Sequence, residues 1–372
     1  MKIRYLSLIA ATLLPATNLR AEENTAANRP TPDLPARWLQ QMDANQDGKL
    51  AKSETSGIML RFFDRNDTDK DGFISDGELR DLAGRLGKRM ANRTPRPGNS
   101  GTALPSVPDD VEVVADIGYR EGDSQAWKLD LVTPKEKAKE PRPGLVFVHG
   151  GGWRNGDKRA GTFFNGAVEY AQKGYVCITV NYRLTGEAPF PACIEDVKCA
   201  VRWFRAHAGE YGVDPERIGG YGNSAGAHLV AMLGLAKKGA GLEGDGPWQD
   251  QSSLIQSVCA SATPTDFSLF QNSKNNRDRF KNENYDDAEL SKLSSPINHV
   301  SADAPPFLLI HGTADTTVNV KHSDSFVEAL KKAGNEDITY IRVDGAGHGV
   351  YNQNRDETHP AMEKFFARTL GR

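Results

Sequence analysis

The chain has 372 residues, of which 38 % are hydrophobic, 26 % are charged and 8 % are aromatic, so it is not a wholly disordered chain. Its length is enough for about two domains with a substantial core, and its four cysteines are too few for a disulfide scaffold. A net charge of −3 leaves no basic surplus for binding nucleic acid, and a mean hydropathy of −0.55 excludes a membrane-embedded body.

The first 21 residues have the features of a secretory signal peptide. Lys2 and Arg4 make the start positive, and residues 5–14 form an apolar run that is too short to cross a hydrocarbon core about 30 Å thick. Ala21 offers a cleavage position before two glutamates. We therefore expect residues 1–21 to be removed and the protein to be secreted or periplasmic, with a signal anchor or a buried helix as the alternative. No second long apolar stretch follows, so we expect no membrane span.

Two acidic loops between residues 33 and 87 share one twelve-residue pattern. Each loop has oxygen-bearing side chains at positions 1, 3 and 5, glycine at position 6 and glutamate at position 12. Calcium takes six to eight oxygen ligands, and the glycine permits the sharp turn of such a loop. Position 7 binds calcium through its backbone carbonyl, so its side chain is free to vary. The predicted calcium ligands are Asp43, Asn45, Asp47, Lys49 and Glu54 in the first loop and Asp67, Asp69, Asp71, Phe73 and Glu78 in the second.

These loops resemble EF-hands, which implies a compact, mainly helical calcium-binding pair over residues 33–87, joined by a strand contact between Leu50 and Ile74. The first loop has three ligand carboxylates against four in the second, so we expect it to bind calcium more weakly. The loops start only 24 residues apart, as in dockerin-like modules, although Glu54 and Glu78 stand where dockerins usually have aspartate. Outside the cell we expect calcium saturation, and therefore a structural role or a docking partner rather than sensing. The alternative is two acidic surface turns.

A linker and then a larger domain follow. Residues 88–110 contain four prolines and few apolar residues, which predicts an interdomain linker. Residues 111–372 alternate short apolar runs with amphipathic stretches, which predicts an α/β domain with a mostly parallel sheet flanked by helices and an antiparallel pair at its start. Its predicted strands are 111–119, 127–133, 145–148, 175–180, 217–221, 256–260, 307–310 and 338–343, and its helices include 194–208, 225–236 and 322–333. In such sheets the site forms at the carboxyl ends of the strands.

Two glycine-rich motifs stand at predicted strand ends. GNSAG (222–226) lies between a strand and a helix, where an elbow holds Ser224 in a strained turn that admits only very small neighbours. HGGGW (149–153) follows another strand, and a glycine run lets backbone N–H groups point at one locus, as an oxyanion hole requires. We predict that the hole consists of the amides of Gly151, Gly152 and Ala225. The alternative for the glycine run is a flexible turn.

Asp315 and His348 complete the predicted catalytic group. Asp315 lies in HGTAD (311–315) after one predicted strand, and His348 lies in GAGHG (345–349) after the next. A serine hydroxyl is a weak nucleophile at neutral pH, so it needs a histidine base whose tautomer is fixed by a carboxylate. The chain order Ser224, Asp315, His348 is that of α/β-hydrolases.

Residues 111–370 resemble the α/β-hydrolase superfamily on its esterase and lipase side, and within it feruloyl- or acetyl-xylan-esterase-like (BD-FAE-like) enzymes. The matching stretches are HGGGWRNGDK (149–158), VNYRL (180–184), DPERI (214–218), GNSAGAH (222–228), APPFLLIHGTADTTV (304–318) and GAGHG (345–349). The resemblance implies Ser224 as nucleophile, His348 as base and Asp315 as acid, an acyl-enzyme, no catalytic cofactor, and short-acyl or feruloyl esters of polysaccharides as substrates. Asn223, where glycine, aspartate or glutamate is common, leaves the acyl preference open.

Several further residues have less specific roles in this prediction. We expect His149 and His311 to bond locally and His228 to pack, while His359, just before the last helix at Pro360, is the alternative base. Cys177 and Cys259 should be free, whereas Cys193 and Cys199 could form a bridge. The polar segments 237–253 and 271–300 are the expected cap, and they favour a polar substrate. Two other functions stay open: a serine peptidase of the prolyl-oligopeptidase type, and a non-catalytic protein that binds a partner through calcium.

Overall fold

The computed structural model describes residues 35, 39, 42–55, 63–91, 104–122, 124–270 and 276–371. They belong to two compact units, residues 1–96 and 97–372, and each unit is described by itself. The predicted signal peptide 1–21 and positions 92–103 of the predicted linker 88–110 lie outside the described residues. None of the helices in the described ranges is long and apolar enough to cross a membrane.

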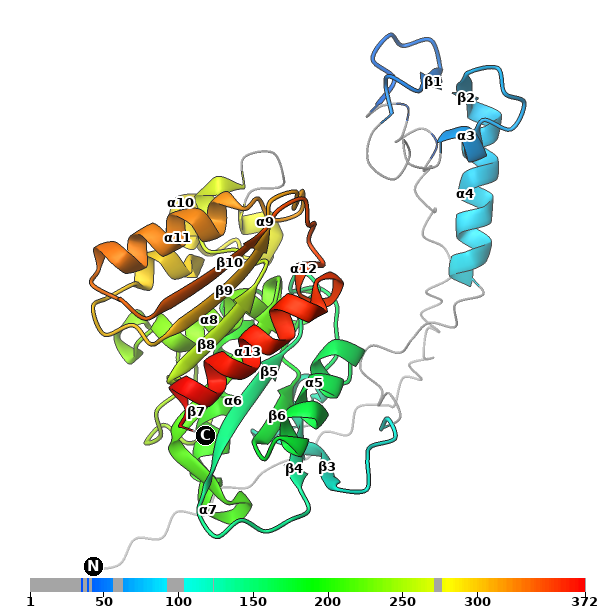
Figure 1. Cartoon of the computed structure of the whole chain (residues 1–372). Coiled ribbons are helices and arrows are strands. Elements are labelled where there is room, and N and C mark those ends of the chain that lie inside the picture. The colour runs from blue at the N-terminus through cyan, green and yellow to red at the C-terminus, as the bar shows by residue number, and fades with distance from the viewer. Residues whose placement is uncertain are drawn as a thin grey trace, which may run out of the picture. The chain divides into compact units, whose positions relative to one another are not determined.

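The N-terminal unit holds the two predicted calcium loops next to a short antiparallel ribbon (Figure 1). Its elements are β1 (Lys49–Ala51), α3 (Phe63–Asn66), β2 (Phe73–Ser75) and α4 (Asp76–Ala91). Leu50 of β1 lies opposite Ile74 of β2, which confirms the predicted strand contact between the loops. The small buried core consists of Leu50, Phe63, Ile74 and Leu79. This core fixes the two loops against each other.

The C-terminal unit is built on one eight-stranded sheet in the order β10-β9-β8-β7-β5-β6-β4-β3 (Figure 1). Its strands are β3 (Val111–Gly118), β4 (Lys128–Pro134), β5 (Arg142–Val148), β6 (Val176–Val180), β7 (Val213–Asn223), β8 (Ser257–Ser261), β9 (Phe307–Gly312) and β10 (Ile338–Val343). Strand β4 pairs antiparallel with both β3 and β6, and the other neighbours are parallel. The predicted mostly parallel sheet with an antiparallel start is confirmed.

Both faces of this sheet are buried, as strand β5 illustrates. Leu145 and Phe147 lie in one hydrophobic cluster and Val146 and Val148 in the other, because successive side chains of a strand point to opposite faces. Helices α6 (Ala192–Ala206), α8 (Ala225–Leu235) and α11 (Lys321–Lys332) contribute to the cluster of Val146, and α5 (Gly161–Gln172) and α13 (Arg355–Thr369) to the other (Figure 1). The shorter helices are α7 (Ala208–Tyr211), α9 (Asn276–Phe280), α10 (Asp287–Ser294) and α12 (Val350–Gln353), with 3-10 turns η1 (Gln125–Trp127), η2 (Lys238–Ala240), η3 (Phe267–Leu269) and η4 (Pro296–His299).

The last helix begins earlier than the sequence predicts. Its start was expected at Pro360, but α13 begins at Arg355 and contains Pro360. Proline lacks an N–H, so Pro360 cannot donate to the carbonyl of Asp356 one turn earlier, and the helix continues without this one bond. The amides of Glu357 and Thr358 already bond to the carbonyl of Asn354, which starts the helix before the proline.

All four cysteines are free and buried. This confirms the expectation for Cys177 and Cys259, and it shows that the bridge considered for Cys193 and Cys199 is absent. Both of these residues lie on α6, within the hydrophobic core. Burial raises the pKa of the Cys193 thiol, so the group stays protonated and behaves as a small apolar side chain.

Candidate active site

Ser224 lies at a strained elbow between β7 and α8. Its backbone has φ +56° and ψ −121°, a conformation that residues with a Cβ adopt only under constraint. A Cβ at Gly222 would come within 2.3 Å of the backbone of Gly226, and a Cβ at Gly226 within 2.0 Å of the Val148 carbonyl oxygen. The Ser224 amide donates to the Ser261 carbonyl at 2.9 Å. These contacts explain why both flanking residues are glycine and why the elbow holds its shape.

The structure brings Ser224, His348 and Asp315 together at the carboxyl ends of the parallel strands. His348 Nε2 lies 2.9 Å from Ser224 Oγ, and His348 Nδ1 lies 2.7 Å from Asp315 Oδ2. The Asp315 side chain is fully buried, whereas that of His348 is 29 % exposed. Because the carboxylate accepts the Nδ1 proton, Nε2 keeps its lone pair toward the serine hydroxyl. The arrangement can therefore move a proton from Ser224 to His348.

Asp315 is held as an ionised acceptor. Its Oδ1 accepts hydrogen bonds from the amides of Thr317 at 2.8 Å and Val318 at 3.0 Å. Burial alone would raise the pKa of Asp315, but hydrogen bonds from His311, His348 and the Val318 amide outweigh it, so this pKa lies well below its usual value. The carboxylate consequently remains charged throughout the range in which an esterase would work.

His311 is a contact of Asp315 that sequence reasoning missed. As expected, it bonds locally, with Nδ1 2.6 Å from Ser323 Oγ and Nε2 2.9 Å from the Val318 carbonyl oxygen. However, the same Nε2 also lies 3.4 Å from Asp315 Oδ2. The signal that could have revealed this contact is the spacing of the two residues, four positions apart in the HGTAD loop.

The glycine motif of residues 149–153 runs against the serine elbow. A Cβ at Gly150 would lie 2.7 Å from the Asn223 carbonyl oxygen, and a Cβ at Gly151 would lie 2.0 Å from the Asn155 carbonyl oxygen. Gly151 and Gly152 have φ of +121° and +61°, so glycine is required at Gly151 by both space and conformation. The turn closes through the Asn155 amide, which donates to the Gly151 carbonyl at 3.1 Å.

The amides predicted to form the oxyanion hole are available to a ligand. Gly151 and Gly152 are exposed, and within the described part of the chain neither amide has a hydrogen-bond acceptor. Ala225 is the first residue of α8, where a backbone N–H has no acceptor inside the helix. Donors of this kind stabilise an oxygen on which negative charge develops.

The other histidines lie in structural positions. His149 is buried, stacks on Tyr182 with ring centroids 4.4 Å apart, and bonds through Nδ1 to the Gly150 carbonyl at 2.9 Å, which confirms the local bond expected for it. His359, the alternative base, stacks on Tyr351 and lies 4.0 Å from Glu169, and it is His348 that contacts Ser224.

The two predicted cap segments are attached differently. Segment 237–253 is fixed to α6, because Lys198 Nζ bonds to Glu243 at 2.7 Å and to Ser253 at 2.9 Å. The described part of segment 271–300 instead reaches the glycine motif, since the Phe280 ring lies 5.0 Å from that of Trp153. The guanidinium of Arg154, the residue after the motif, also donates to the Asp278 carbonyl at 3.4 Å. The second segment is therefore the one that borders the candidate site.

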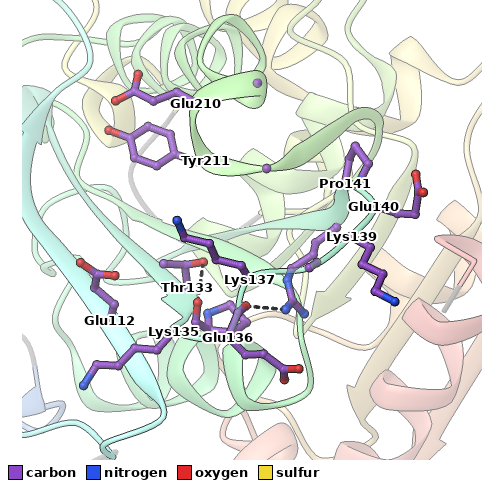
Figure 2. A pocket seen from close by; sticks show the side chains of 15 residues that line it. Glu112, Thr133, Lys135, Glu136, Lys137, Lys139, Glu140, Pro141, Glu210 and Tyr211 are labelled. Carbon is purple, nitrogen blue, oxygen red and sulfur yellow. Dashed lines mark hydrogen bonds between the residues drawn. The ribbon is translucent and has the colours of Figure 1, made fainter.

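A separate hollow of about 540 Å³ opens at the amino ends of β5 and β7, the sheet edge opposite Ser224. Figure 2 shows Glu210 and Tyr211 on one side of it and Lys135 and Lys137 on the other. None of the predicted catalytic or oxyanion residues lines this hollow.

The second acidic loop of the N-terminal unit fits a calcium ion. Asp67, Asp69 and Asp71 each place a carboxylate oxygen within 4.8 Å of the others. Asp67 Oδ1 is buried without a hydrogen-bond partner among the described residues, as expected for an atom that ligates a metal. Burial would raise the pKa of Glu78, but bonds from Ser75 and Thr68 lower it to about 2, so this carboxylate is also charged. Oxygen ligands with these charges suit calcium.

The first loop has a similar internal arrangement. Asp43 accepts the amides of Asp47 at 3.2 Å and Gly48 at 2.9 Å, and Asn45 Oδ1 accepts the Asp47 amide at 2.9 Å. Glu54 folds back onto the Asn45 amide at 3.2 Å. The position 7 residues, Lys49 and Phe73, begin the two paired strands, and Lys49 Nζ lies 5.5 Å from the centre of the Phe73 ring.

Three buried histidines make stability depend on pH. Burial lowers the pKa of His149, His228 and His322 to about 4. In the unfolded chain these histidines bind protons near pH 6.5, so the folded state loses stability as the pH falls from about 6.5 toward 4. Since the unfolded chain then binds up to three more protons than the folded one, the free energy of unfolding should fall by up to about 4 kcal/mol per pH unit. Urea unfolding at pH 7, 6 and 5 measures this slope. A free energy of unfolding that does not change between pH 7 and 5 would contradict the prediction.

Comparison with known proteins finds matches for both units of the chain. The profile of the BD-FAE family matches residues 129–330, and the EF hand profile matches residues 36–59 and 60–83. "Esterase LipC" of Mycobacterium tuberculosis is 33 % identical over 61 % of this chain and 58 % of its own length. "Probable carboxylic ester hydrolase LipM" of the same organism is 29 % identical over 73 % of this chain and 66 % of its own length. The chain thus spans less than two thirds of these relatives.

Solved structures show the same architecture. A truncated carbohydrate esterase from gut microbiota superposes with a TM-score of 0.66 at 26 % identity, over 72 % of this chain and 100 % of that one. Thermogutta terrifontis esterase 2, phosphoramylated by tabun, superposes with a TM-score of 0.60 at 29 % identity, over 71 % of this chain and 96 % of that one. Both are similar to the C-terminal unit in its fold.

Proposed function

The chain belongs to the BD-FAE family of α/β-hydrolase esterases and also carries an EF-hand pair, and from this premise we propose that it is a secreted serine ester hydrolase acting on short-acyl or feruloyl esters of polysaccharides. The observation that carries the proposal is the hydrogen-bonded series Ser224, His348, Asp315 at the carboxyl edge of the sheet. The free amides at Gly151 and Gly152 support it, since acyl transfer needs both a nucleophile and an oxyanion site.

In this mechanism Ser224 Oγ attacks the ester carbonyl carbon while His348 Nε2 takes the hydroxyl proton. The carbonyl oxygen becomes negative and accepts hydrogen bonds from the glycine amides and from Ala225. When the intermediate collapses, His348 returns the proton to the departing alcohol and an acyl-enzyme remains. A water molecule, deprotonated by His348, then attacks the acyl carbon, and Ser224 leaves with the proton. Asp315 stabilises the positively charged His348 in both halves of the reaction.

The substrate proposal rests on the polar cap and on the similarity to a carbohydrate esterase. Arg279 of the cap forms a cation–π pair with Phe270, the residue directly before the cap segment, with the guanidinium 3.9 Å from the ring centre. This polar contact does not resemble an apolar lid for long acyl chains. Turnover of nitrophenyl acetate and nitrophenyl palmitate tests acyl length, and acetylated and feruloylated xylan then test the alcohol. Preferred cleavage of palmitate would overturn the substrate class. No turnover of any ester by the folded, calcium-loaded protein would overturn the function and leave peptide hydrolysis and calcium-dependent binding to be tested.

Calcium removal is expected to destabilise the N-terminal unit and to leave ester turnover nearly unchanged. Metal binding to such loops is coupled to their folding, and none of the predicted catalytic residues lies in them. Calorimetry should show that EDTA moves the unfolding transition of the N-terminal unit to a lower temperature, while nitrophenyl acetate turnover stays within about twofold. Glu78→Gln should reproduce the effect of EDTA on that transition. Loss of turnover in EDTA, with the C-terminal unit still folded, would instead give calcium a role in catalysis.

A further inference from the structure

Trp153 follows the two glycines of the predicted oxyanion hole and has an unfavourable backbone. Its φ is +58°, the left-handed region that a bulky aromatic residue rarely adopts. Its side chain is nevertheless only 4 % exposed, in contact with Phe267 and Phe280 at ring distances of 5.6 and 5.0 Å. The Trp153 carbonyl accepts the Thr185 amide at 2.8 Å, and this bond together with the contacts of the buried side chain holds the backbone against its own preference.

His228 supplies the hydrogen bond that holds the Trp153 side chain. The indole Nε1 lies 3.1 Å from His228 Nδ1, and His228 Nε2 lies 2.7 Å from the carbonyl oxygen of Ser294. An indole N–H can only donate and a carbonyl can only accept, so Nδ1 must carry the lone pair and Nε2 the proton. The Ser294 carbonyl thus fixes the His228 tautomer that accepts the Trp153 bond. Burial lowers the pKa of His228 to about 4, which keeps the ring neutral at neutral pH.

The same histidine connects the two sides of the predicted oxyanion hole. His228 lies on α8, in the helical turn that begins with Ala225, and its amide donates to the Ser224 carbonyl at 3.0 Å. Trp153 lies on the other side, directly after the glycine amides. Ser294 ends α10 in the cap segment. One fully buried ring therefore joins the nucleophile helix, the glycine loop and the cap.

We propose that His228 is a positioning residue for the oxyanion hole: it accepts the Trp153 indole hydrogen bond and so keeps the preceding glycine amides aimed at the reacting carbonyl. This inference rests on the proposed esterase function. It goes beyond the packing role expected from the sequence, because a residue that only packs would affect stability and not the chemical step. Loss of the bond would let Trp153 leave its left-handed conformation and turn the adjoining peptide away from the substrate.

The test uses Trp153→Phe, which keeps an aromatic ring but removes the N–H, together with His228→Phe and the double variant. kcat and KM for nitrophenyl acetate are measured on the full chain with calcium, per active site titrated with an organophosphonate. We expect kcat to fall by about tenfold in each single variant, less than the loss of a direct oxyanion donor, with KM within about twofold. The double variant should lose no more than the stronger single variant, because the Trp153–His228 bond is already absent in each single variant.

Phe326→Leu is the matched control, since Phe326 is equally buried on α11 and packs on Phe307 at the amino end of β9, away from the carboxyl edge. Its kcat per titrated site should stay within about twofold even if stability falls. An unchanged kcat in Trp153→Phe, or losses that multiply in the double variant, would overturn the proposal. If His228→Phe does not fold, Trp153→Phe decides alone. Absence of wild-type turnover would instead refute the proposed function, so the two failures are distinguishable.

Discussion

Ser224→Ala should abolish ester turnover, with kcat for nitrophenyl acetate falling by about 10⁶, the scale of nucleophile loss in serine hydrolases. The hydroxyl is the only group of this residue that can form the acyl-enzyme, and it already lies 2.9 Å from the base His348. Ser224 also stands at the N-cap of α8, yet its side chain makes no capping bond. The substitution therefore removes the nucleophile and leaves the helix start as it is.

The readout is steady-state turnover together with thermal unfolding of both proteins. We expect the free energy of unfolding to change by less than about 1 kcal/mol, because no buried donor or acceptor other than His348 Nε2 loses its partner. Ser301→Ala is a matched control, since its hydroxyl donates to Asp303 at 2.7 Å, close to the amino end of β9 and away from the carboxyl edge. It should retain wild-type kcat. A folded Ser224→Ala protein with more than about 1 % of wild-type turnover would refute Ser224 as the nucleophile.

Much of the C-terminal fold is encoded in local sequence patterns. The run Leu145–Val148 predicts a strand buried on both faces, and it lies in β5 at the centre of the sheet. The helix predicted over 194–208 is α6, displaced by two residues at each end. These elements are found because their periodicity is local and their flanking residues are turn formers.

Local sequence patterns do not predict ion pairs between residues that lie far apart in the chain. Asp130 lies between Leu129 and Leu131 in β4 and is fully buried. It binds Lys158 and Arg159, each at 2.6 Å, and these residues follow the end of the glycine motif by five and six positions. A buried carboxylate needs such partners, but the sequence does not say which cations will reach it from 28 positions away. The predicted roles of Ser224, Asp315 and His348 came from strand-end motifs, whereas the supports of the site came only from three-dimensional packing.

Asp315→Asn is expected to lower kcat by about 10⁴ although it changes a single atom, which is the cost of a wrong histidine tautomer in a serine-protease triad. The reason is that the two oxygens of the carboxylate have different hydrogen-bond partners. Oδ1 accepts the amides of Thr317 and Val318, so the carbonyl oxygen of an asparagine must take that position. The NH₂ group then replaces Oδ2 and faces His348 Nδ1.

An NH₂ donor at that position selects the opposite tautomer of His348, with the lone pair on Nδ1 and the proton on Nε2. Such a ring cannot take the Ser224 proton. The asparagine also places a donor toward Nε2 of His311, 3.4 Å away, and this donor–donor contact lowers stability as well as activity. The opposite amide orientation would place the NH₂ group against the amides of Thr317 and Val318. Donors would then face donors, so this orientation is also unfavourable.

The measurement is kcat for nitrophenyl acetate in folded Asp315→Asn, with Asp324→Asn as the control. Asp324 also accepts a side-chain bond, from Tyr340 at 2.8 Å, but it lies on α11 outside the serine–histidine pair, so its kcat should stay within about twofold of wild type. If Asp315→Asn kept more than about a tenth of wild-type kcat, His348 would have to be oriented without the carboxylate. Because the Asp315 side chain is fully buried and its two oxygens have separate partners, the structure predicts that no other group can replace it.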